Sequence, residues 1–121
     1  MGTKKSQLLS GMKKASIEMI LLKLLSESDK YGYQLSQDFK KRSAGLYTIM
    51  EGSMYPILYP LTDQHYISCY DKKVGKRQVR VYYHLEEEGR KYYNQLLDDY
   101  QEFSDVIAFL LHSDENSVYP Q

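Results

Sequence analysis

A helical pattern that runs directly into two strand patterns places the strongest limit on how this chain can fold. Over about residues 51–65, apolar side chains recur at helical spacing on one face, at Met54, Ile57, Leu58 and Leu61. Two strand patterns follow at once, over about residues 66–70 and 78–85, joined by the basic, glycine-containing segment 71–78. The second strand alternates polar side chains with apolar ones at Val79, Val81, Tyr83 and Leu85. This succession predicts a short helix followed by a hairpin with a cationic tip.

Two further helices are predicted upstream of this segment. Residues 14–26 carry a broad apolar stripe, which is typical of a central core helix. Residues 27–30 read as a turn, in which Ser28 or Asp29 caps the next helix. That helix is expected over residues 31–42, where three side chains at four-residue intervals are predicted to be buried: Tyr31, Leu35 and Phe39.

The connection to the third helix, and that helix itself, leave alternatives open. Residues 46–50 are rich in strand formers and are expected to add a third strand to the hairpin. The third helix begins somewhere within residues 50–53. Pro60 lacks the N–H that a regular helix needs, so we expect either a bend or an early end near Tyr59. His65 stands where the helix stops and is expected to adopt a left-handed backbone.

A long last helix is predicted over residues 87–112. Its apolar positions are spaced by 4, 3, 4 and 3 residues, at Leu96, Tyr100, Phe103, Ile107 and Leu110. A mean spacing of 3.5 residues is typical of a helix that packs against partner helices. A chain of this size cannot easily cover that apolar surface, so these five side chains are predicted to form a homodimer interface.

Length and composition exclude several classes of protein. The 121 residues suit one domain, and the single cysteine, Cys69, indicates a reducing, intracellular setting. No apolar run reaches the roughly 18 residues of a membrane span, and the N-terminus lacks a signal-peptide profile. The remaining metal-ligating side chains, His65, His84 and His112, lie far apart. We therefore expect a cytoplasmic protein that is not an enzyme, needs no cofactor or metal, and has no membrane partner.

The charges are strongly segregated although their sum is zero. Residues 1–85 carry 14 Lys or Arg against 7 Asp or Glu, a net of +7, and residues 86–121 carry 2 against 9, a net of −7. A basic face attracts phosphates locally, because salt screens distant acidic groups within roughly 8–10 Å. The N-terminal part is therefore the expected nucleic-acid-binding surface.

Candidate DNA contacts fall into three groups. Ser53, Tyr55 and Tyr59 lie on the exposed face of the third helix and are expected in the major groove, where their hydroxyls can bond phosphates or base edges. The hairpin cations are expected on backbone phosphates or in a minor groove: Lys72, Lys73, Lys76 and Arg77. Lys13 and Lys14, at the start of the first helix, are candidates for flanking phosphates. Together these features favour a DNA-binding winged helix-turn-helix of mainly α (α+β) class.

Three motifs in order resemble those of the PadR family of transcriptional regulators: residues 31–35 (YGYQL), 51–58 (EGSMYPIL) and 82–89 (YYHLEEEG). The length is similar to that of the small subfamily with a single C-terminal dimerisation helix. The resemblance implies a two-fold dimer that binds a palindromic double-stranded DNA operator, usually as a repressor. It also implies release by a small aromatic effector near the dimer interface, for which the candidate pocket residues are Tyr92, Tyr93, Tyr100 and Phe103.

The expected organisation is one compact domain with three parts. Residues 1–85 form the winged helix-turn-helix, residues 86–113 the C-terminal dimerisation helix, and residues 114–121 a flexible tail. An alternative function stays open, in which the winged helix is a protein–protein interaction module that docks through its tyrosine-rich surfaces and does not bind DNA sequence-specifically.

Overall fold

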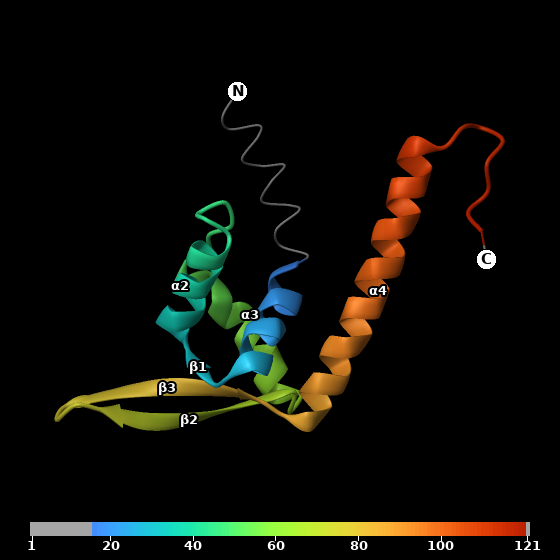
Figure 1. Ribbon diagram of the computed structural model, residues 1–121. Coiled ribbons are helices and arrows are strands. Elements are labelled where there is room, and N and C mark those ends of the chain that lie inside the picture. Colours follow the sequence, from blue (N-terminus) through green and yellow to red (C-terminus); the bar gives the residue numbers. More distant parts are fainter. Residues whose placement is uncertain (1–15, 121) are drawn as a thin grey trace.

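The computed structural model describes residues 16–120 and shows a helical cluster on one side of a small antiparallel sheet, with one long helix standing beside it (Figure 1). In chain order the elements are a helix over residues 16–27, β1 (Lys30–Tyr31), α2 (Gly32–Arg42), α3 (Glu51–Asp63), β2 (Ile67–Val74), β3 (Gln78–Leu85) and α4 (Glu87–His112). The strand order is β1-β3-β2. The predicted α+β winged helix-turn-helix with a long last helix is confirmed.

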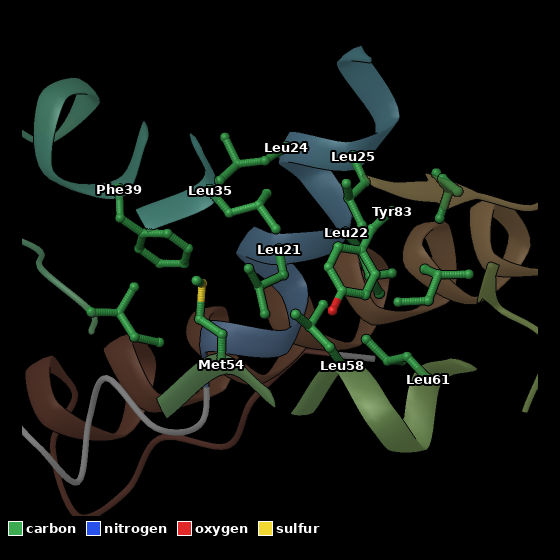
Figure 2. Packing of buried hydrophobic residues seen from close by; sticks show 13 residues of the cluster. Leu21, Leu22, Leu24, Leu25, Leu35, Phe39, Met54, Leu58, Leu61 and Tyr83 are labelled. Carbon is green, nitrogen blue, oxygen red and sulfur yellow. The ribbon is translucent and has the colours of Figure 1, made fainter. Parts of the chain in front are cut away.

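One apolar core joins the first three helices to the base of the sheet (Figure 2). The helix of residues 16–27 lies at its centre and contributes four leucines: Leu21, Leu22, Leu24 and Leu25. The side chains around them come from α2, α3 and the sheet: Leu35, Phe39, Met54, Leu58, Leu61, Ile67, Tyr83 and Leu85. Each fully buried aliphatic side chain stabilises the fold by roughly 1.5–3 kcal/mol relative to an exposed one.

The start of α2 differs from the prediction. Tyr31 lies in β1, where Lys30 pairs with Tyr83 and Tyr31 with Tyr82 of β3, so its placement inside the second helix is wrong. Tyr31 is also the N-cap of α2, and no side chain makes a capping hydrogen bond there. The predicted cap at Ser28 or Asp29 is therefore wrong: the Asp29 carboxylate accepts hydrogen bonds from the hairpin instead.

The third strand of the sheet is β1, and the prediction of a strand over residues 46–50 is wrong. In that segment, serine side chains satisfy the backbone in place of a strand ladder. The Ser36 hydroxyl donates to the carbonyl of Ile49 over 2.7 Å, and the Ser43 hydroxyl bonds both the N–H and the carbonyl of Tyr47. These bonds fasten the segment to α2 and the residue that follows it.

Helix α3 starts within the predicted window and continues through Pro60 to Asp63, so the predicted early end near Tyr59 is wrong. Pro56 and Pro60 each remove a hydrogen bond to the carbonyl four residues earlier. Both prolines lie on the exposed face, where water can solvate those carbonyls. The opposite face keeps its full apolar contact with the core through Met54, Leu58 and Leu61.

The end of α3 is set by a left-handed residue. His65 has a φ of 63°, which confirms the prediction for this position. The N–H of Tyr66 donates to the carbonyl of Leu61, and the N–H of His65 donates to that of Thr62, each over 3.0 Å. This pair of bonds satisfies the last carbonyls of the helix and turns the chain directly into β2.

The hairpin of β2 and β3 forms a wing that projects from the helical cluster (Figure 1). Strand β3 has its predicted bounds, but β2 is longer than predicted and extends to Val74, so that Lys72 and Lys73 lie in a strand and not in the turn. Val79 and Val81 are 54% and 44% exposed, because the outer half of the wing lies beyond the core. The apolar side chains of the alternating pattern are therefore buried only in the inner half of β3, at Tyr83 and Leu85.

Helix α4 has its predicted bounds and contacts the rest of the molecule mainly near its start. Gly89 is buried against the carbonyl of Tyr66. The ring of Tyr92 stacks on that of Tyr66 with centroids 4.4 Å apart, and its hydroxyl donates to Glu18 over 2.6 Å. Further along the helix, Phe103 and Leu110 are 66% and 67% exposed. Most of the helix therefore stands away from the core, as Figure 1 shows.

Candidate nucleic-acid interface

The exposed face of α3 is made of small and apolar side chains. Because the core side of the helix is occupied by Met54, Leu58 and Leu61, the opposite side faces solvent. The side chains and backbone positions exposed there are Gly52, Ser53, Pro56, Tyr59 and Pro60. Of the predicted α3 contacts, Ser53 and Tyr59 therefore lie on the open face, whereas Tyr55 is half-buried at its border.

Tyr55 is held in place by its own helix. Its hydroxyl donates to the carboxylate of Glu51 over 3.0 Å, and its ring stacks with that of Tyr59, with centroids 5.8 Å apart and planes 20° from parallel. Burial, and then the hydrogen bond to Glu51, raise the pKa of Tyr55. The Tyr55 hydroxyl is therefore engaged within the helix, and the ring of Tyr55 supports that of Tyr59.

A surface hollow of about 630 Å³ separates α3 from the wing. Tyr55 and Tyr59 line it on the α3 side, and Cys69, Val81 and Tyr83 line it on the sheet side. Other groups at its border, which the sequence did not single out as contacts, are Tyr33, Gln78 and Arg80. Arg80 lies 4.3 Å from the ring centroid of Tyr31, a cation–π contact that fixes its guanidinium beside the hollow.

The wing cations lie on both faces of the hairpin and at its turn. The ammonium of Lys72 lies 5.0 Å from the ring centroid of Tyr82, on the face of the sheet away from the core. Lys73 pairs with Val79, and by alternation it shares the face of Tyr83, which packs on the helices. Lys76 and Arg77 form the turn with Gly75, which has a left-handed φ of 77°.

These cations are free to meet an anionic partner. Among residues 16–120, no carboxylate lies within ion-pair distance of the wing cations Lys72, Lys73, Lys76, Arg77 or Arg80. By contrast, Arg42 forms a two-pronged bond with Glu27, with nitrogen–oxygen distances of 2.5 and 2.9 Å. That bond lowers the pKa of Glu27. Lys13 and Lys14 lie outside the described residues.

A polar clamp holds the base of the wing. Asp29 accepts hydrogen bonds from the Tyr70 hydroxyl over 2.8 Å and from the His84 ring over 2.7 Å. The rings of Tyr31, Tyr82 and Tyr70 form a row across the three strands, with centroids 5.3 and 5.7 Å apart. The base of the wing is therefore tied to the turn after the first helix.

The candidate effector residues fall into two groups. Tyr100 and Phe103 line a surface hollow of about 460 Å³ beside α4, together with Glu18, Met19, Leu96 and Asp99. Tyr92 and Tyr93 are not among its lining residues and pack against the core. Among the described residues no group of His, Cys, Asp and Glu side chains is placed to hold a metal ion. None of the described helices is both long and apolar enough to cross a membrane.

Comparison with known proteins identifies the family to which this chain belongs. The model of the transcriptional regulator PadR-like family matches residues 21–95, which include α2, α3, the wing and the start of α4. This chain belongs to the PadR-like family. Members of this family regulate transcription and are not enzymes.

Solved structures of related regulators share the fold. A transcriptional regulator from Clostridium thermocellum is 31% identical, with a TM-score of 0.75 over 81% of this chain and 95% of its own. A PadR family regulator from Eggerthella lenta is 19% identical, with a TM-score of 0.83 over 93% and 96% of the two chains. PadR of Bacillus subtilis, solved in complex with operator DNA, is 23% identical, with a TM-score of 0.62 over 67% of this PadR-like chain and 46% of its own.

Proposed function

We propose that this PadR-like regulator is a cytoplasmic, dimeric DNA-binding repressor, in which each protomer reads one half of a palindromic operator. Helix α3 enters the major groove, with Ser53 and Tyr59 at its surface and Tyr55 supporting Tyr59. The wing cations Lys72, Lys73, Lys76 and Arg77 hold backbone phosphates on either side of the groove. Lys13 and Lys14 are assigned to flanking phosphates from their sequence position alone.

The observation that carries this proposal is the set of cations on a projecting wing that form no ion pair with any carboxylate of residues 16–120. Helix α4 is acidic, in contrast to the basic wing. Its first turn carries Glu87 and Glu88, and it holds several more carboxylates along its length. Phosphates are therefore attracted to the end of the molecule that holds α3 and the wing, and are repelled from α4.

The exposed apolar positions on α4 support the dimer. Tyr100, Phe103, Ile107 and Leu110 are each at least 40% exposed in one chain, and Leu96 continues the same face toward the core. A second α4 packed on this face would cover them at coiled-coil spacing. The two-fold axis of such a dimer would place two wings and two α3 helices on one duplex.

The hollow beside α4 supports release by a ligand. Phe103 and Tyr100 offer aromatic surface to a small aromatic effector at the border of the proposed dimer interface, and Glu18 and Asp99 add negative charge. Tyr92 and Tyr93 would act through the packing of α4 against the core. A ligand that binds the hollow more tightly in one dimer geometry shifts the spacing of the two α3 helices.

The test is retardation of DNA from the region upstream of the protein's own gene, measured at several salt concentrations. Wild type should bind at low salt, and its affinity should fall steeply as salt is added. Lys73→Ala with Arg77→Ala should weaken binding on all sequences and reduce the salt slope by about 2, which is roughly 0.9 per lost phosphate contact. Lys91→Ala, which removes a cation paired with Glu88 on α4, is the matched control and should leave the slope unchanged.

Absence of binding to that DNA at low salt, and to a pool of genomic fragments, would favour the second candidate function. In that case the tyrosine row across the sheet, with Tyr70 42% exposed, would serve as a docking surface for a protein.

A further inference from the structure

Helix α3 has an unusual charge for an element that is proposed to enter a DNA groove. From Glu51 to Asp63 it contains no Lys, Arg or His, and both of its ends are acidic. Paired hydrogen bonds from Arg or Lys to guanine, the commonest specific contact in the major groove, are therefore unavailable to α3. Any discrimination between bases by this helix must come from hydroxyl groups or from apolar surface.

The centre of its open face carries no polar side chain. Gly52, Pro56 and Pro60 are spaced by four residues and form one exposed line along the helix, which we term the α3 stripe. A Cβ atom added at Gly52 would meet no heavy atom within 4 Å, so the space above the first turn is open. Neither proline has an N–H, and neither ring carries a polar group. Ser53 and Tyr59 border the stripe on its two sides.

The core does not explain these prolines. A proline in the interior of a helix costs roughly 3 kcal/mol when nothing relieves it, and Pro56 and Pro60 bury no side chain in return. Residues that break a local rule without a gain in packing occur mainly at functional sites. The gain must then arise when the exposed face of α3 meets its partner.

Among the groups that DNA presents in the major groove, only the 5-methyl group of thymine is apolar. We infer that the α3 stripe reads thymine methyl groups, so that α3 selects A·T base pairs at the centre of each half-site while the wing supplies the phosphate contacts. Gly52 lets the first turn approach the base edges, and the rings of Pro56 and Pro60 pack on the methyl groups. This inference rests on the proposed function, because it requires α3 to lie in the major groove.

The experiment compares two forms of one DNA fragment, amplified from the upstream region with either thymidine or deoxyuridine triphosphate. Uracil keeps the base-pairing groups of thymine and lacks only the methyl group. Wild type should bind the uracil form about fourfold more weakly for each methyl group contacted. In Pro56→Ser with Pro60→Ser, the ratio of the two dissociation constants should fall to near 1.

Two controls separate the stripe from other effects. The serine variant should keep the wild-type salt slope, because no phosphate contact is lost. Lys73→Ala should show the reverse pattern, with a smaller slope and an unchanged preference for thymine. Removing a helix-breaking residue does not threaten folding, and the single variant Pro60→Ser, with thermal melting of each protein, checks this directly.

Equal affinity of wild type for the two DNA forms would overturn the inference. So would a full preference for thymine that persists in the double serine variant, because the preference would then arise from DNA shape or from other side chains. Failure of wild type to bind the thymine form at all would instead reject the proposed function.

Discussion

His84 donates its Nδ1–H to the carboxylate of Asp29, with 2.7 Å between the two heavy atoms, and so fastens the last strand of the wing to the turn that follows the first helix. The second carboxylate oxygen accepts a hydrogen bond from the Tyr70 hydroxyl, and both bonds favour the ionised form of Asp29. Burial raises the pKa of Asp29, but the hydrogen bonds from His84 and Tyr70 outweigh it and leave the pKa below its usual value.

The Asp29 clamp should make stability depend on acid pH. Because its pKa is lower in the folded chain, its contribution is present above the unfolded pKa of about 4 and is lost as pH falls through the folded value. Asp29→Asn should reduce the free energy of unfolding at pH 7 by about 1 kcal/mol, since the site is partly exposed. Urea unfolding from pH 7 to pH 3 should show this deficit closing. Asp98→Asn, which alters an exposed carboxylate without a hydrogen bond or ion pair in residues 16–120, serves as the control.

Substitution of alanine for two of the glycines should change the stability of the protein in opposite directions. A Cβ atom at Gly89 would overlap the carbonyl oxygen of Tyr66 and lie 2.8 Å from Leu85 Cδ1, so Gly89→Ala should destabilise the protein by roughly 1–3 kcal/mol. Gly52→Ala meets no atom within 4 Å and should stabilise α3 by up to about 1 kcal/mol through helix propensity. Chemical denaturation of both variants measures the difference. A Gly89→Ala protein as stable as wild type would show that the start of α4 does not pack as described.

The Tyr92 hydroxyl should contribute stability that disappears at alkaline pH. Burial, and then its hydrogen bond to Glu18, raise the pKa of Tyr92 to about 12. A raised pKa gives a contribution that is complete below the unfolded value of about 10 and is lost as pH rises toward 12. Tyr92→Phe keeps the ring stack on Tyr66 and should lose about 1–2 kcal/mol at pH 8. This deficit should shrink between pH 10 and 12. Tyr93→Phe is the control, since its hydroxyl makes no hydrogen bond that the described residues show.

Charge placed on the exposed face of α4 should separate the proposed dimer. Phe103 is 66% exposed in the single chain, so Phe103→Glu should leave the folded protomer intact. The dissociation constant of the dimer should rise roughly 30-fold, the effect of losing an interface side chain that contributes about 2 kcal/mol. Light scattering across a micromolar dilution series measures this change. Asn94→Glu puts the same charge on the opposite side of α4 and should have no effect. A wild-type protein that is monomeric at these concentrations would contradict the dimer.

Local sequence patterns were sufficient to predict those elements whose structure depends on residues close together in the chain. The apolar helical period after residue 86 predicted a long last helix with the bounds that α4 has, and the alternation around Tyr83 predicted the bounds of β3. His65 was predicted as a left-handed helix end because the helical period stops there and a strand pattern begins. In each case the deciding forces act between residues close in the chain: periodic apolar burial, turn conformation and helix capping.

Contacts between segments distant in the sequence decided the third strand of the sheet and the length of α3. Residues 30–31 complete the sheet because they pair with β3. In residues 46–50, the hydroxyls of Ser36 and Ser43 form hydrogen bonds with backbone groups that a strand would use for pairing. Helix α3 survives Pro60 because Met54, Leu58 and Leu61 anchor its other face, a stabilisation that no local rule counts. Periodicity could show that the chain makes a helix and a basic wing, since both follow from side-chain order. Only packing could show that the two prolines face outward beside that wing, because exposure depends on what the rest of the chain covers.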